Sequence, residues 1–246
     1  MMDRNLGATS ATPGDVGALG LLYQWGRKDP FLGSSSISSN IEAKSTGTWP
    51  SAVSSNSTNG TIEYATAYPT TFITYNSSNY DWYYTGSSTT DNTRWTTSTA
   101  TKSIYDPCPS GWRVPDGGNN GIWSKALGSS SDFEVWYDTT NNGMNFSGKF
   151  GSASTIWYPA SGFRYDIDGD LYNVGSYAYF WSASPYSYNA YNLYFDASRR
   201  HARSSRATIP LLYSLFCVHR ANHPRLQPPS LARRLWLRHP RLRVSM

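Results

Sequence analysis

The chain has 246 residues, of which 15% are aromatic and 15% are charged. Its net charge of +5 is divided unevenly, because residues 1–197 hold 10 Lys and Arg against 16 Asp and Glu, whereas residues 198–246 hold 11 Arg and no acidic residue. The body of the chain is therefore mildly acidic, which excludes nucleic acid as its expected partner and assigns the basic character to the C-terminal segment.

The sequence predicts no membrane span, because it contains no run of 18 apolar residues. Residues 1–4 are not followed by an apolar region, so no signal peptide is expected in the sequence as it stands. An exported form would have lost its leader or would leave the cell by another route.

The N-terminal half divides into two parts of different composition. Short apolar pieces between glycines fill residues 1–33 and predict short strands or one short helix with tight turns. Residues 34–103 are rich in Ser, Thr, Asn and Tyr without a helical period, which is typical of a long loop insertion or of irregular β structure. The aromatic residues of this second part, such as Trp82 and Trp95, are unusual for a disordered segment.

Three prolines and a glycine punctuate the motif YDPCPSGWRVP. Around it, Ile104, Trp112 and Val114 are predicted to lie on one side of a short buried strand. Residues 121–128 form the one helix that the sequence predicts, with Gly128 as its stop.

The rest of the body predicts strands and hairpins. Residues 165–172 are interpreted as two strand ends around a turn. Residues 177–184 and 191–195 alternate with a period of two, so they are predicted to pair through a polar loop that includes Pro185. The run 209–218 is too short to cross a membrane and predicts a buried strand.

After Ser198 the chain is built from Arg, Leu, Pro, His and Ser, with no Gly, Lys, Asp or Glu. Two explanations are open: a basic interaction tail, or translation of a shifted reading frame. The second is favoured for residues 220–246, which are predicted to be disordered or derived from a frameshift.

Five motifs follow one another along the body: MDRNLGAT, LLYQWGR, YDPCPSGWRVPD, YPASGFRYDIDGDLYNVGSYAYFWSAS and YNLYF. In this order they resemble the Fibrobacter succinogenes major paralogous domain family, which occurs in surface proteins and lipoproteins of Bacteroidetes. The resemblance implies an α+β, C-type-lectin-like fold of mostly short antiparallel strands with long loops and one or two short helices. It implies one domain over residues 1–197 with a variable insertion at about 34–103, and a closing strand of the same domain within 198–219.

In such folds the N- and C-terminal strands pair, and long loops display the binding face. The resemblance implies an extracellular or cell-surface location. The chain also resembles the variable proteins of diversity-generating retroelements, which use this lectin-like fold. That resemblance would place hypervariable positions within residues 187–212 and would allow a location in a virion.

Cys108 and Cys217 are the two cysteines of the chain, and they are compatible with one disulfide or with two free thiols. Cys108 matches the cysteine of the family's DPCP motif, and Cys217 lies where the family has a cysteine in its last strand. The resemblance therefore implies a Cys108–Cys217 disulfide.

Signals for metal binding and catalysis are weak. Asp166, Asp168 and Asp170 have the spacing of oxygen ligands for calcium, but without the glycine and distal glutamate of an EF-hand a solvated turn is favoured, and no other cofactor is expected. The body has no His to serve as a base, and acid pairs such as Asp132 and Glu134 are interpreted as solvated. No enzyme activity is predicted, and an enzyme of the formylglycine-generating fold is kept as an alternative.

Aromatic and amide side chains are the better candidates, because Tyr and Trp rings stack on flat ligand surfaces while amides donate and accept hydrogen bonds. The expected ligand-binding residues lie on and beside the loop between the two paired strands: Tyr186, Tyr188, Asn189, Tyr191 and Asn192. We expect a non-catalytic adhesion or ligand-binding module whose partner is a glycan or a protein. A purely structural component of a surface or a virion is the other alternative.

Several residues of the motifs are expected to build the scaffold. Trp112, Trp181 and Phe195 are predicted to pack in the core. Arg113 and Asp3 are predicted to be members of structural ion pairs. The variable loops would then carry the binding.

Overall fold

The computed structural model describes residues 2–37, 51–75, 77–88, 93–96, 101–119, 121–127, 136–146, 156–187, 189–198, 203–208, 212–215 and 217–219. Within these residues the fold is mixed α+β with mostly strands, which confirms the expected class at this coarse level. The helices are the 3₁₀-helix η1 (Val16–Ala18) and the α-helices α1 (Ile62–Ala67) and α2 (Ile122–Leu127). None of them has the length and apolar character that a membrane crossing requires.

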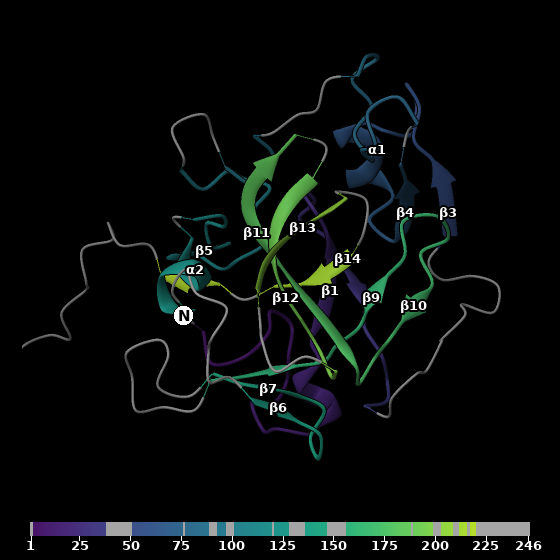
Figure 1. Cartoon of the computed structure of the whole chain (residues 1–246). Helices are drawn as coiled ribbons and strands as arrows, with labels where there is room; N and C mark the ends of the chain where they lie inside the picture. Colours follow the sequence, from purple (N-terminus) through teal and green to yellow (C-terminus); the bar gives the residue numbers. More distant parts are fainter. Residues whose placement is uncertain are drawn as a thin grey trace, which may run out of the picture.

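The largest sheet of the described residues has eight strands, in the order β10-β9-β14-β11-β12-β13, with β1 joined to β14 and β2 to β1. Its strands are β1 (Leu21–Gln24), β2 (Pro30–Leu32), β9 (Phe163–Arg164), β10 (Leu171–Tyr172), β11 (Tyr177–Tyr186), β12 (Asn189–Asp196), β13 (Arg203–Thr208) and β14 (Leu212–Ser214). Figure 1 shows β11 and β12 running through the middle of the molecule, with α1 on one side of them and α2 on the other.

Three smaller sheets surround the large one: β15-β5, β3-β4 and β6-β7-β8. Their strands are β3 (Ser51–Ser54), β4 (Thr71–Thr74), β5 (Trp112–Arg113), β6 (Trp136–Asp138), β7 (Gly143–Asn145), β8 (Trp157–Pro159) and β15 (Val218–His219). β3 and β4 are parallel, whereas the strands of the other two small sheets are antiparallel.

The hairpin of β11 and β12 is longer and tighter than the sequence predicted. The alternating pattern correctly predicts the two strands, but the predicted loop around Pro185 is wrong, because Pro185 pairs with Ala190 after a shift in register. The turn between Tyr186 and Asn189 is only two residues long. Ser187 takes a left-handed backbone with a φ of 53°, as two-residue hairpin turns commonly require.

Four buried tryptophans connect the segment 23–27 and β11 to other parts of the chain through hydrogen bonds from their indole N–H groups. Each donor reaches a backbone carbonyl far away in sequence, so each bond ties two distant segments together and satisfies a buried polar group. The donor and acceptor pairs are Trp181 to Tyr23 at 3.0 Å, Trp25 to Ser182 at 2.9 Å, Trp82 to Trp25 at 2.7 Å and Trp95 to Arg27 at 3.1 Å.

The described residues between 51 and 96 contribute several side chains to the core. Phe72, Ile73, Trp82 and Trp95 are all fully buried in the hydrophobic clusters of the fold. The described part of residues 34–103 forms β3, α1 and β4 besides irregular segments.

The C-terminal strands close the fold against its beginning. β14 pairs with β1, and β15 pairs with β5. The backbone N–H of Met2 donates to the carbonyl of Cys217 at 2.9 Å, and that of Leu6 donates to Leu215 at 2.7 Å. The segment 198–219 thus supplies three short strands rather than one closing strand, and residues 220–246 lie outside the described residues.

The scaffold predictions are mostly confirmed. Trp181 and Phe195 are fully buried, and Trp112 is partly buried against the core. The predicted helix corresponds to α2. Ile104 was predicted wrongly, since it is 77% exposed instead of sharing the buried face of Val114.

Both predicted ion pairs are present. The guanidinium of Arg113 binds Asp116 at 2.5 Å, and Asp3 binds the adjacent Arg4 at 2.8 Å. Both pairs are partly solvent-exposed, so they fix local geometry more than they stabilise the fold.

Candidate ligand-binding surface

The residues that the sequence predicted to bind a ligand lie at and beside the turn of the β11–β12 hairpin. Only some of them are exposed. Tyr186 is 43% exposed, and its ring lies edge-on to that of Tyr191 with 5.5 Å between ring centroids. Asn189 and Tyr191 are partly buried, and Tyr188 lies outside the described residues. Tyr186 is therefore the most exposed of the predicted residues that the structure describes.

Tyr191 packs against the loop that follows β5. A Cβ added at Gly117 would lie 2.6 Å from the Cβ of Tyr191, and one at Gly118 would lie 3.3 Å from its ring. The Ser182 hydroxyl donates to the Tyr191 carbonyl at 2.7 Å. Because glycine has no side chain, Tyr191 can pack closely against the backbone at these two positions. Tyr191 therefore contributes to packing and is also partly exposed.

Asn192 was predicted to bind a ligand, and the structure places its side chain fully buried. Tyr191 and Asn192 are neighbours in a strand and point to opposite faces of the sheet. The predicted strand began at Tyr191, whereas β12 begins at Asn189.

Replacing Asn192 by valine should raise the free energy of unfolding by about 1–2 kcal/mol. Both polar atoms of its amide are buried and lack a hydrogen-bond partner within the described part of the chain. An apolar residue there removes a desolvation penalty and suits a strand. Urea denaturation of wild type and Asn192→Val measures the difference, and a loss of stability would show that the amide has a structural partner.

The three acids of the predicted calcium loop lie in the turn between β9 and β10. Asp168 accepts from the backbone N–H of Asp170 at 2.9 Å and lies 3.4 Å from the hydroxyl of Tyr172. Among the described residues no three His, Cys, Asp or Glu gather closely enough to hold a metal ion, and Asp166, Asp168 and Asp170 are no exception. The geometry is that of an Asx-type turn.

The strand register brings a larger set of aromatic side chains together than the hairpin does. Tyr179 on β11 pairs with Tyr194 on β12, and Phe163 on β9 pairs with Tyr172 on β10. Residues that pair directly across strands share one face of a sheet. Tyr177 lies two residues before Tyr179 and therefore on the same face.

We call this set, together with Tyr165 at the end of β9, the aromatic face. Its rings touch in an unbroken series. The centroid distances along the series are 5.7 Å from Tyr165 to Tyr172, 6.0 Å to Phe163, 5.3 Å to Tyr179, 4.8 Å to Tyr194 and 6.1 Å to Tyr177. Tyr165 is 39% exposed, Tyr194 is buried, and the other four are partly exposed.

Buried rings on the same face of the sheet border the aromatic face. The Tyr213 ring stacks on Tyr179 at 4.4 Å and lies 4.3 Å from Trp181. Burial raises the pKa of Tyr213 well above its ordinary value. Burial and the hydrogen bond to Asp196 likewise raise the pKa of Tyr194. The hydroxyl groups of Tyr213 and Tyr194 are therefore uncharged at neutral pH.

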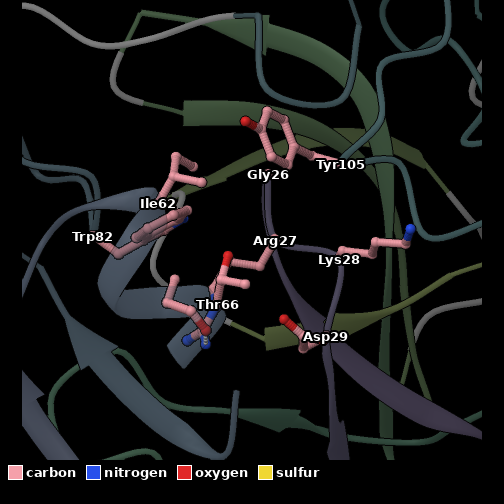
Figure 2. Close-up of a pocket in the computed structure, with 9 residues that line it drawn as sticks. Gly26, Arg27, Lys28, Asp29, Ile62, Thr66, Trp82 and Tyr105 are labelled. Carbon is pink, nitrogen blue, oxygen red and sulfur yellow. Dashed lines mark hydrogen bonds between the residues drawn. The ribbon is translucent and has the colours of Figure 1, made fainter. Parts of the chain in front are cut away.

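A shallow pocket of about 30 Å³ lies elsewhere, beside Arg27. Figure 2 shows Ile62, Thr66 and Trp82 gathered around Arg27, whereas the Lys28 side chain extends away from this group. Arg27 donates to the carbonyls of several residues at the end of α1 and in β4, including Ala65 at 3.2 Å and Thr71 at 2.8 Å. The pocket is smaller than typical ligand sites of about 300–1,000 Å³.

Arg27 is a structural residue of this pocket. Burial lowers the pKa of its guanidinium to about 10, and the nearby Asp29 opposes this shift. The group therefore stays charged at neutral pH, and its bonds to backbone carbonyls hold α1 against β4.

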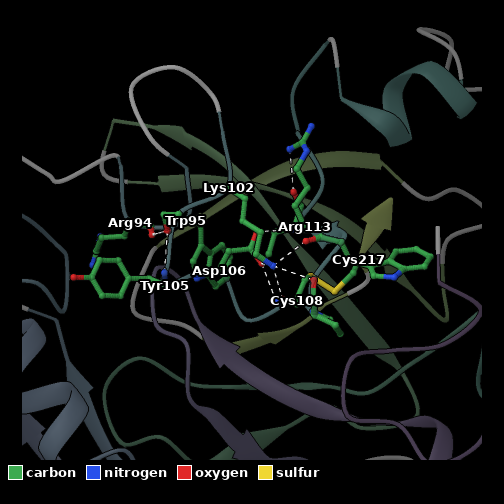
Figure 3. A network of polar contacts seen from close by, with 12 residues as sticks. Arg94, Trp95, Lys102, Tyr105, Asp106, Cys108, Arg113 and Cys217 are labelled. Carbon is green, nitrogen blue, oxygen red and sulfur yellow. Dashed lines mark hydrogen bonds and ion pairs between the residues drawn. A yellow bond between two sulfur atoms is a disulfide. The ribbon is translucent and has the colours of Figure 1, made fainter. Parts of the chain in front are cut away.

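The DPCP motif also builds a structural site, which Figure 3 shows beside the disulfide. Asp106 accepts from the backbone N–H groups of Cys108 at 2.8 Å and Val114 at 2.9 Å, and it pairs with Lys102 at 3.2 Å. Burial raises the pKa of Asp106, and these bonds oppose the shift. Cys108 and Cys217 are joined in a disulfide, with a Cα–Cα distance of 5.9 Å.

The sequence did contain a signal for the aromatic face. In YAYFWSAS every second residue from Tyr177 to Trp181 is aromatic, which indicates a strand with one aromatic side. The contribution of Phe163 and Tyr172 depends on the pairing of β9 with β10 and on their place in the sheet, which the local pattern does not give.

Comparison with protein-family models, with curated proteins and with solved structures finds no match for this chain.

Proposed function

We propose that this chain is a non-catalytic ligand-binding module with a C-type-lectin-like fold, and that it binds a glycan or a protein through the aromatic face. The observation that carries the proposal is the unbroken contact of six aromatic rings on one side of the large sheet. Five of these rings are partly or largely exposed.

Such a surface suits recognition for a physical reason. Tyr side chains supply a large contact area with only two side-chain torsions to order, and their hydroxyls still form hydrogen bonds. The buried Tyr213 ring stacks on Tyr179 and helps to hold its ring in place before any ligand arrives. A preformed surface avoids part of the ordering cost of binding.

The proposed setting is extracellular, on a bacterial cell surface or in a virion. The Cys108–Cys217 disulfide supports this setting, because disulfides persist in oxidising compartments. Membership of the Fibrobacter succinogenes major paralogous domain family, and the link to variable proteins of retroelements, are proposals that rest on the order of the sequence motifs.

Tyr179→Ala is expected to lower affinity at least tenfold on an array of glycans and surface proteins, because it removes the ring that contacts both Phe163 and Tyr194. Tyr165→Ala tests the same surface at its exposed end. The matched control is Tyr68→Ala, which removes a tyrosine that is 53% exposed outside the aromatic face.

Circular dichroism and the urea midpoint check that each variant is folded. Unchanged binding by both folded aromatic-face variants would contradict the proposal.

A further inference from the structure

We propose that the ligand of the aromatic face is a neutral oligosaccharide of several units that lies along the series of rings. This inference rests on the proposed function, since it names the class of ligand for the same surface. It rests on three features: the continuity of the rings, the hydroxyl groups that they carry, and the carboxylates at one end.

The continuity favours an extended ligand. Neighbouring centroids from Tyr165 to Tyr177 are 4.8–6.1 Å apart, so the ring contacts run from β10 and β9, past β14, to β11 and β12. A single sugar would cover only part of the surface, whereas a chain of sugars can contact successive rings at once.

The chemistry of the rings favours a carbohydrate. Five of the six members are tyrosines, which combine an apolar ring face with a hydroxyl. The apolar side of a pyranose ring can stack on the face of a tyrosine ring, and the sugar hydroxyls can form hydrogen bonds with the tyrosine hydroxyl. The Tyr165–Tyr172 end adds the exposed carboxylate of Asp168, which is a strong acceptor for hydroxyl groups.

The charge near Tyr165 favours a neutral ligand over an acidic one. The turn beside it carries Asp166, Asp168 and Asp170. The adjacent Arg164 is buried and donates to the carbonyls of Leu32 at 2.9 Å and Gly169 at 2.7 Å. Uronic or sulfated sugars would therefore meet carboxylates at this end, and like charges repel.

The other end of the aromatic face lies beside β13, because Tyr194 pairs with Arg203 in the β12–β13 ladder. The acidic turn and this strand lie at opposite sides of the sheet order. The discrimination against acidic sugars is therefore expected at the Tyr165 end, where Asp168→Asn tests it.

The test is an array of neutral oligosaccharides of one to six glucose, xylose, mannose, galactose or N-acetylglucosamine units, printed beside uronic-acid oligomers of the same lengths. Wild type should bind at least one neutral series, with affinity rising tenfold or more between the disaccharide and the longest member. Tyr165→Ala should lower the affinity for the longest bound member by a larger factor than the affinity for the shortest. Asp168→Asn should narrow the preference for neutral over uronic oligomers.

The outcomes separate this inference from the proposed function. Equal affinity for short and long members, or a preference for uronic oligomers, would overturn the oligosaccharide assignment. Binding only to arrayed proteins would also overturn the oligosaccharide assignment. If Tyr179→Ala abolished that protein binding, the proposed binding function of the aromatic face would still be supported. If no arrayed glycan or protein binding depended on Tyr179 or Tyr165, both proposals would fail.

Discussion

Removing the disulfide by the double substitution Cys108→Ala/Cys217→Ala is expected to lower the free energy of unfolding by about 4–5 kcal/mol. The two residues are 109 positions apart, so the bond restricts a long loop in the unfolded chain. Both cysteines are also buried, at 5% and 0% exposure, which adds a smaller packing loss. Urea denaturation of the variant and of wild type measures the difference.

Wild type unfolded in the presence of a reducing agent provides the control, because it loses the bond but keeps both side chains. Its free energy of unfolding should fall by nearly the same amount as that of the double variant. A loss below about 1 kcal/mol in both would contradict the loop-closure argument.

The same change should have a local signature. Cys217 accepts from the backbone N–H of Met2, and the following β15 pairs with β5. Without the disulfide these short pairings have fewer constraints, and short elements are the first to open locally. Hydrogen exchange at Met2 and in β15 should therefore accelerate more than exchange in the centre of β11.

The sequence predicted the local elements of the fold better than their arrangement. Alternation predicted β11 and β12, and the turn chemistry of residues 165–172 predicted the ends of β9 and β10. Both signals come from a few consecutive residues. The place of β14 between β9 and β11 has no such signal, because it depends on contacts between distant segments.

The candidate site shows the same limit. Tyr186 and Asn192 were grouped because they are close in sequence, but one is 43% exposed and the other is fully buried. The predicted strand of residues 191–195 already contained Asn192, but alternation alone does not show which faces of a strand the rest of the chain covers. In the structure every residue from Asn192 to Asp196 is buried, so neither face of this part of β12 is exposed.

The Ser-, Thr- and Asn-rich composition of residues 34–103 gave no indication of the buried ion pair between Arg94 and Asp81. Arg94 and Asp81 have side-chain exposures of only 1% and 0%. No periodic pattern signals such a pair, because each partner lies in irregular structure and only the folded chain brings them to 2.5 Å. Arg94 also lies over the rings of Trp25 and Trp82, with 5.1 and 4.8 Å to their centroids.

Asp81→Asn is expected to lower the free energy of unfolding by about 3–5 kcal/mol, because it leaves the Arg94 guanidinium buried without a carboxylate. The substitution keeps an acceptor for the Tyr83 backbone N–H, which now donates to Asp81 at 3.1 Å, so the local turn is retained. Urea denaturation followed by tryptophan fluorescence measures the loss, since Trp25 and Trp82 lie beside the pair.

A second substitution distinguishes the unpaired charge from a general loss of packing. Arg94→Met removes the charge and places a flexible, polarisable side chain beside the tryptophan rings. Because a buried pair is costly to break but can be replaced by apolar groups, Arg94→Met in the Asp81→Asn background should recover more than half of the lost stability. The effects of the two substitutions would then be strongly non-additive in a double-mutant cycle. Simple additivity would show instead that Arg94 stabilises the fold through its ring contacts, and that Asp81 acts mainly through the turn at Tyr83.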